Sequence, residues 1–253
     1  MTDTHAHLDF LEPEELEEVR LDELLAVLTL GIDPARWERT LELAQGNVYA
    51  AVGLHPTEAH LLSPEVEEAL RHYARHARVR AIGESGLDYY WTPETKAAQL
   101  RALDFQAALA EELGLPLVLH VRSRDGKAEE ELAHWLLLHR PKRVVLHAYG
   151  GHPDLERAGL EVGAYFSFAG PLTYPKNAAL KEAARRLPRE RLLLETDTPF
   201  LPPVPHRGKR NRPQYVRHTL EALAEALGMP FLEAERLTDQ NAARLFRWDN
   251  GGV

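Results

Sequence analysis

The first ten residues contain two histidines, His5 and His7, that are separated by one residue and flanked by Asp3 and Asp9. Alternate residues of a β-strand point to the same side, so the two imidazoles would share one face if this segment is extended. Imidazole and carboxylate groups are typical ligands of divalent metal ions, so residues of these types on one face could form a metal site. A solvated N-terminus could carry the same residues, so the rest of the chain must decide between the two interpretations.

Further ionisable residues stand at the ends of short apolar runs. They are His55 in GLHP, Glu84 in GESGLDYY, His120 in LHVR, His147 in LHAYGG and Asp197 in ETDTPF. We expect each of these runs to be a buried strand. If the strands are parallel and form a closed barrel, their ends meet at one rim, where the active sites of such barrels lie. The pattern therefore predicts a ring of ligand-type side chains.

A ring of this kind needs bound cations, because clustered carboxylates repel one another and buried imidazoles lose their hydration. Without His55, the ring contains four histidines and two carboxylates. These are more ligands than one tetrahedral ion requires, which indicates two divalent ions that share a carboxylate. Glu84 is central in the strand order and is the expected bridge. The other expected ligands are His5, His7 and Asp197 for one ion, and His120 and His147 for the other. Mg²⁺, Mn²⁺ and Zn²⁺ all remain candidates.

Eight apolar runs alternate with amphipathic stretches along the chain. We predict strands up to His5 and at 24–30, 48–55, 79–84, 116–120, 143–147, 164–168 and 192–196. We predict helices at 34–45, 64–77, 94–113, 127–139, 152–162, 176–187, 212–228 and 231–246, with Thr238 or Asn241 capping the last one. This alternation predicts an α/β fold, a (β/α)8 TIM barrel that forms a single domain over residues 1–253. An open doubly wound sheet usually carries a glycine-rich phosphate loop after its first strand, where this chain has HAHLDF.

Composition excludes several classes of protein. The chain contains no cysteine, so a disulfide, a thiolate zinc site and a cysteine nucleophile are all impossible. No apolar run is long enough to cross a bilayer and no signal pattern opens the chain, so we expect a cytoplasmic protein. We also expect it to be a monomer. The net charge of −9 argues against a protein that binds nucleic acid through a generally basic surface. A phosphate-bearing substrate would need a local basic patch.

The segment HRGKRNRP at 206–213 is such a patch, and it follows the eighth predicted strand, where barrels often bind phosphate. We expect Arg207 and Arg210 in this segment, together with Arg122 after the fifth strand, to contact substrate phosphates. His55 is predicted to contact substrate or to support a ligand rather than to bind metal. The aromatic run at 89–91 could stack on a base or simply pack.

The motifs DTHAHLDF, GLHP, GESGLDYY, LHVR, LHAYGG and ETDTPFLPP, in this order and spacing, closely resemble those of the TatD-type metal-dependent deoxyribonucleases. The resemblance extends from Thr4 to the terminal NAARLF, and that family consists of TIM-barrel members of the metal-dependent hydrolase superfamily. It implies that the divalent-metal ligands are His5, His7, Glu84, His120, His147 and Asp197. It also implies a phosphodiesterase that hydrolyses DNA, expected to be single-stranded, from the 3′ end.

The expected mechanism is attack on phosphorus by a water molecule that two metal ions activate. Asp197 would accept its proton and Glu84 would hold both ions. One alternative is an amidohydrolase-type enzyme that cleaves a C–N or ester bond on the same barrel. Many such enzymes bridge their metals with a carbamylated lysine after the fourth strand, where this chain has Glu84. The other alternative is an inactive metal-binding partner protein, which a broken ligand set would indicate.

Overall fold

The protein is described by a computed structural model that covers residues 1–248 and contains one sheet of eight strands in the order β1 to β8. The strands are β1 (Thr2–Ala6), β2 (Ala26–Gly31), β3 (Val48–Val52), β4 (Val79–Asp88), β5 (Leu117–Arg122), β6 (Val144–Leu146), β7 (Tyr165–Phe168) and β8 (Leu192–Leu194). Every neighbouring pair is parallel. The first and last strands meet through a bridge between Ala6 and Thr198 and a 2.8 Å hydrogen bond from the Asp197 amide to the His5 carbonyl. The predicted barrel is confirmed.

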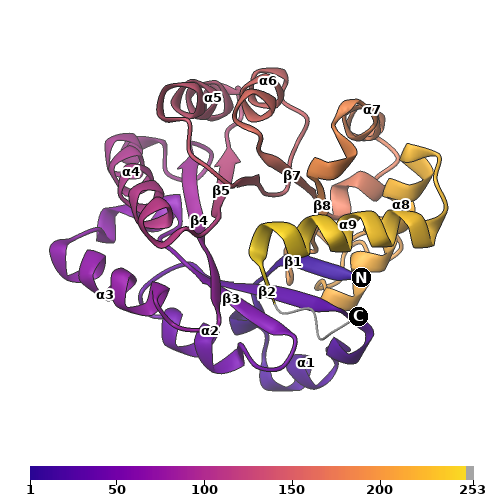
Figure 1. The fold of residues 1–253 in the computed structure, drawn as a ribbon, viewed down its shortest axis with the longest axis horizontal. Coiled ribbons are helices and arrows are strands. Elements are labelled where there is room, and N and C mark those ends of the chain that lie inside the picture. The colour runs from indigo at the N-terminus through magenta and orange to yellow at the C-terminus, as the bar shows by residue number, and fades with distance from the viewer. Residues whose placement is uncertain (249–253) are drawn as a thin grey trace.

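Helices surround the strands on the outside of the barrel (Figure 1). They are α1 (Pro13–Glu17), α2 (Trp37–Leu43), α3 (Pro64–Ala74), α4 (Lys96–Leu113), α5 (Lys127–His139), α6 (Pro153–Val162), α7 (Ala178–Arg186), α8 (Val216–Leu227) and α9 (Phe231–Phe246). Of these, α5 and α9 match the predicted bounds at both ends, whereas the short helix α1 was not predicted. Among the described residues, no helix combines the length and the apolar character that a membrane span requires.

The predicted cap of the last helix is wrong. Helix α9 begins at Phe231, so Thr238 and Asn241 lie inside it. The Asn241 side-chain amide donates to the backbone carbonyls of Arg189 and Leu192, at 2.8 and 2.9 Å, and so ties the helix to the start of β8. Asparagine is common at helix ends, but here tertiary contacts determine its place.

Helix α9 covers the N-terminal ends of the strands. Apolar side chains that point into the barrel, among them Leu28 and Val118, form one buried cluster with Leu245 and Phe246 of this helix. The amino group of Met1 also pairs with Glu235 on α9, at 2.8 Å. Because the helix closes this end of the barrel, a site for substrate can form only at the carboxyl ends of the strands.

Candidate metal centre

The centre is built around Glu84, which lies in the middle of β4 and is only 3% exposed. Strand β4 runs four residues past its predicted end and pairs with β5 as far as Asp88 and Arg122. Gly86 permits this close pairing, because a Cβ atom there would lie 1.9 Å from the His120 carbonyl oxygen. The residue type at Gly86 therefore helps to bring β4, and Glu84 with it, close to His120.

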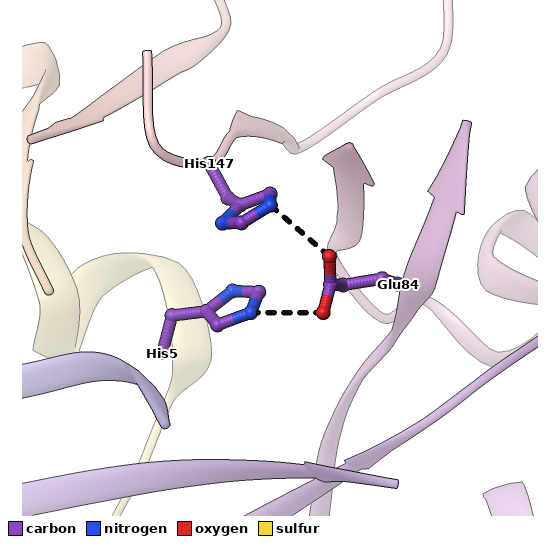
Figure 2. A group of neighbouring side chains, drawn as sticks. All are labelled: His5, Glu84 and His147. Carbon is purple, nitrogen blue, oxygen red and sulfur yellow. Dashed lines mark hydrogen bonds and ion pairs between the residues drawn. The ribbon is translucent and has the colours of Figure 1, made fainter. Parts of the chain in front are cut away.

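The two carboxylate oxygens of Glu84 face two different pairs of histidines. Oε1 lies 3.1 Å from Nε2 of His5 and 3.0 Å from Nε2 of His7. Oε2 lies 3.0 Å from Nε2 of His147 and 3.4 Å from Nδ1 of His120. Figure 2 shows His5 and His147 pointing at different oxygens of the same carboxylate. Glu84 is thus placed between two groups of ring nitrogens.

Asp197 joins the group on the Oε1 side. Its Oδ1 atom lies 3.4 Å from Nε2 of His7 and 3.6 Å from Nε2 of His5. The residue has a φ of 59°, in the left-handed region that few residues other than glycine adopt. A backbone conformation that is unfavourable in free energy persists where contacts of the surrounding structure stabilise it. At Asp197 these contacts include those with His5 and His7.

The spacing of these atoms fits bound metal. Metal–ligand bonds of about 2.0–2.2 Å place neighbouring ligand atoms roughly 2.8–3.6 Å apart. The contacts of Glu84 and Asp197 with His5, His7, His120 and His147 range from 3.0 to 3.6 Å. One group offers Glu84, His5, His7 and Asp197, and the other offers Glu84, His120 and His147. The six residues predicted as ligands therefore converge as the sequence suggested, and their donor set suits two divalent ions.

Charge and burial have opposite effects on the protonation of the groups in the centre. Burial disfavours the charge on Glu84, but the neighbouring His147 and His5 outweigh it and hold the pKa of that carboxyl well below its usual range. Burial likewise disfavours protonation of His147, but Glu84 and Glu195 outweigh it and raise the pKa of this imidazole well above its usual value. The carboxylates thus attract positive charge, which divalent cations could supply in place of protons.

Two carboxylates that were not singled out from the sequence orient the rings of two candidate ligands. Oδ2 of Asp88 lies 2.9 Å from Nε2 of His120, and Oε1 of Glu195 lies 3.0 Å from Nδ1 of His147. In each ring the opposite nitrogen then faces Glu84, which is how ligand histidines are usually supported. A signal for Asp88 existed in GESGLDYY, because Glu84 and Asp88 are an even number of residues apart on one strand and share a face. Glu195 likewise stands two residues before Asp197.

His55 occupies the edge of the centre. Its Nε2 atom lies 3.7 Å from Oε2 of Glu84, and its Nδ1 atom is 2.7 Å from the Thr57 hydroxyl. Burial and the nearby His120 lower the pKa of His55 to about 3, so this imidazole is neutral at pH 7. The Thr57 amide donates to Nδ1 at 3.2 Å, so the neutral ring carries its proton on Nε2 and can donate one hydrogen bond to a bound substrate.

A cavity of about 900 Å³ opens above the centre. Its lining includes Glu84, Asp197 and two cationic side chains, Arg122 and Lys176. Lys176 precedes α7 and was not predicted from the sequence, because one lysine before a helix carries no distinctive pattern. The cavity offers divalent-metal ligands and cations together, a combination that suits an anionic substrate.

The two arginines expected from the basic segment lie elsewhere. Arg210 donates from Nε to Glu15 at 2.7 Å and from Nη2 to the Phe10 carbonyl at 2.8 Å. Arg207 packs its guanidinium over the Tyr174 ring, 3.9 Å from the centroid. Neither side chain lines the cavity. The local basic run was a poor guide to the cavity because contacts with distant parts of the chain place both arginines.

The barrel and its ring of histidines and carboxylates define a class of protein, the metal-dependent hydrolases. Residues 2–247 match the family model described as TatD related DNase, and the chain belongs to this family. It is 36% identical over 254 residues to the uncharacterized metal-dependent hydrolase YabD of Bacillus subtilis, covering 97% of this chain and 98% of YabD.

Two further comparisons agree. The chain is 34% identical over 210 residues to a protein of Klebsiella pneumoniae named 3′-5′ ssDNA/RNA exonuclease TatD, covering 81% of this chain and 79% of that protein. Among solved structures, the TatD homologue YJJV of Escherichia coli superposes with a TM-score of 0.85 and 30% identity, covering 98% of each chain. The resemblance seen in the motifs is confirmed.

Proposed function

We propose that this metal-dependent hydrolase cleaves phosphodiester bonds of single-stranded nucleic acid, with DNA as its substrate, from the 3′ end. The observation that carries the proposal is the position of Glu84, whose two oxygens each face a separate pair of histidine nitrogens at 3.0–3.4 Å. Two ions held by one carboxylate form the arrangement that phosphodiester-cleaving enzymes use for in-line displacement. The name of the Klebsiella relative, which specifies single-stranded DNA and RNA, supports this choice of substrate.

Each side chain would have a distinct part in the reaction. When bound, two divalent ions would supply positive charge for the phosphate oxygens and lower the pKa of the attacking water. Asp197 lines the cavity and would take the proton of that water. Arg122 and Lys176 would bind substrate phosphates, and His55 would contact the substrate beside Glu84.

In the proposed reaction, water hydrolyses the last phosphodiester linkage of the strand. The water oxygen forms a bond to phosphorus, and the bond from phosphorus to the 3′ oxygen of the preceding nucleotide breaks. The departing 3′ oxygen takes a proton, which Asp197 would return after accepting it from the water. The terminal nucleotide leaves with its 5′ phosphate, and the shortened strand has a free 3′ hydroxyl. A nucleoside 5′-monophosphate is therefore the expected product.

A substrate panel tests the proposal. The chelated protein, supplied separately with Mg²⁺, Mn²⁺ or Zn²⁺, would be incubated with single-stranded DNA, duplex DNA, RNA and a cyclic amide of the dihydropyrimidine type. We expect metal-dependent release of 5′-mononucleotides, fastest from single-stranded DNA. Hydrolysis of the amide alone would favour the amidohydrolase alternative, and metal binding without any hydrolysis would favour an inactive partner protein.

A further inference from the structure

Trp91 is unusually exposed for a tryptophan of this protein. Its exposed fraction is 63%, whereas Trp37, Trp135 and Trp248 are all buried at 5% or less. An exposed indole offers a large, rigid apolar face that a bound ligand can cover. Trp91 lines the cavity above the metal centre.

The backbone connects Trp91 firmly to the centre. The amide of Trp91 donates to Oδ1 of Asp88 at 2.8 Å, and the other oxygen of Asp88 contacts His120 at 2.9 Å. The Tyr90 amide donates to the same Oδ1 atom at 3.0 Å. One carboxylate therefore holds both a candidate metal ligand and the backbone of the exposed indole.

A cation accompanies the indole. The Arg122 guanidinium lies 4.2 Å from the centroid of the Tyr90 ring and 5.7 Å from that of Trp91. Arg124 lies 4.6 Å from Tyr90, and the Tyr90 and Trp91 rings meet edge to face with centroids 4.8 Å apart. Two arginines and Trp91 thus pack against the Tyr90 ring, whereas most of the surface of the Trp91 indole is exposed.

We propose that Trp91 stacks on the base of the terminal nucleotide while Arg122 binds its phosphate, so that Trp91 is a specificity-determining residue for unpaired ends. An exposed indole beside a guanidinium matches a nucleotide, which joins a flat aromatic base to an anion. At the end of a duplex the last base is paired through its edge and stacked on its inner neighbour, so only a frayed or single-stranded end frees that base to lie on Trp91 while its phosphate reaches Arg122. This inference rests on the proposed function for the identity of the substrate.

Binding of the product tests the stacking contact without relying on catalysis. Deoxyadenosine 5′-monophosphate would be titrated into the full chain in excess Mg²⁺, with tryptophan emission and calorimetry as readouts. Deoxyribose 5-phosphate, which lacks the base, serves as the matched ligand. We expect the mononucleotide to quench emission and to bind about tenfold more tightly than the sugar phosphate, since base stacking on an aromatic side chain typically has this effect.

Three variants isolate the residue. In Trp91→Ala, calorimetry should show that the tenfold advantage of the mononucleotide is lost, and Trp91→Phe should retain part of it. Leu232→Ala is the control, because Leu232 is also 63% exposed but lies on α9, away from the cavity. Circular dichroism would check that each variant folds. Equal binding of the two ligands by the wild type, or an advantage that survives in Trp91→Ala, would overturn the inference.

Oligonucleotides extend the test to the reaction. The kcat/KM of the wild type should fall about tenfold when the 3′-terminal nucleotide lacks its base, whereas Trp91→Ala should treat both strands alike. The outcomes also separate the two proposals. Base-dependent quenching without cleavage of any nucleic acid would support the role of Trp91 and refute the proposed function. Cleavage of single-stranded DNA with no base dependence would support the proposed function and refute the role of Trp91.

Discussion

Substitution of Glu84, the proposed shared ligand, should reduce the stabilisation that bound metal gives to the fold. A ligand present at 1,000 times its dissociation constant stabilises a protein by about 4.1 kcal/mol. For a chain of 253 residues the entropy of unfolding is about 0.5 kcal/mol/K, so one ion raises the melting temperature by about 8 °C and two ions by about 16 °C.

The variant Glu84→Gln keeps the volume of the buried side chain but changes its ligand atoms. The amide presents its oxygen to only one pair of histidines and turns an NH₂ group, which cannot bind a cation, towards the other. If the ion on that side binds 100-fold more weakly, it loses about 2.8 kcal/mol and about 5 °C of its shift. We therefore expect a total shift of about 11 °C or less.

Differential scanning fluorimetry would measure this shift, with each variant compared between chelator and metal so that any change in the metal-free protein cancels. Glu111→Gln is the matched control, because Glu111 is 63% exposed and pairs with Lys142 on the surface. It should keep the full shift. A Glu84→Gln protein that also kept it would refute the assignment of Glu84 as a shared ligand.

Three further outcomes are expected. Arg122→Ala and Lys176→Ala should each raise KM for a single-stranded oligonucleotide. Each should also reduce the slope of log KM against log salt concentration by about 0.7, as kinetics over a KCl series would show. Arg210→Ala should change KM and this slope less than the other two variants do, and an effect of equal size would contradict the placement of Arg210 outside the cavity. Asp88→Asn should weaken Mn²⁺ binding about 10–100-fold in calorimetry, because the candidate ligand that Asp88 orients loses its support; unchanged affinity would contradict this role. Burial disfavours protonation of His147, but the two glutamates that contact it raise its pKa well above the usual value. The stability that this contributes to the metal-free protein is present below about pH 6.5 and lost as pH rises through the raised pKa, whereas metal affinity rises as the ligands lose protons. Melting temperatures in chelator and in metal should therefore diverge as the pH rises, and parallel curves would contradict the prediction.

Local pattern was sufficient to predict the architecture and to predict which six candidate ligands converge. Apolar runs that alternate with amphipathic stretches specify parallel strands and crossover helices, and parallel closure brings every strand end to one rim. His5 and Asp197 could be paired in advance for this reason, although almost the whole barrel separates them in the chain. The strand bounds were less accurate, as the extension of β4 to Asp88 shows, because pairing with β5 decides where that strand ends.

The roles of the remaining side chains depended on contacts that no local pattern encodes. Sequence showed a basic segment, but only the fold revealed that Arg210 is held by Glu15, 195 residues away, and that Lys176 lines the cavity instead. It showed three consecutive aromatic residues, but only the fold distinguished the packed Tyr90 from the exposed Trp91. The amino-acid sequence thus determined that the six candidate ligands meet at one rim, because strand periodicity and topology are enough for that. The tertiary structure decided which of the other groups reach a substrate, because the direction of a loop side chain depends on neighbours contributed by distant segments.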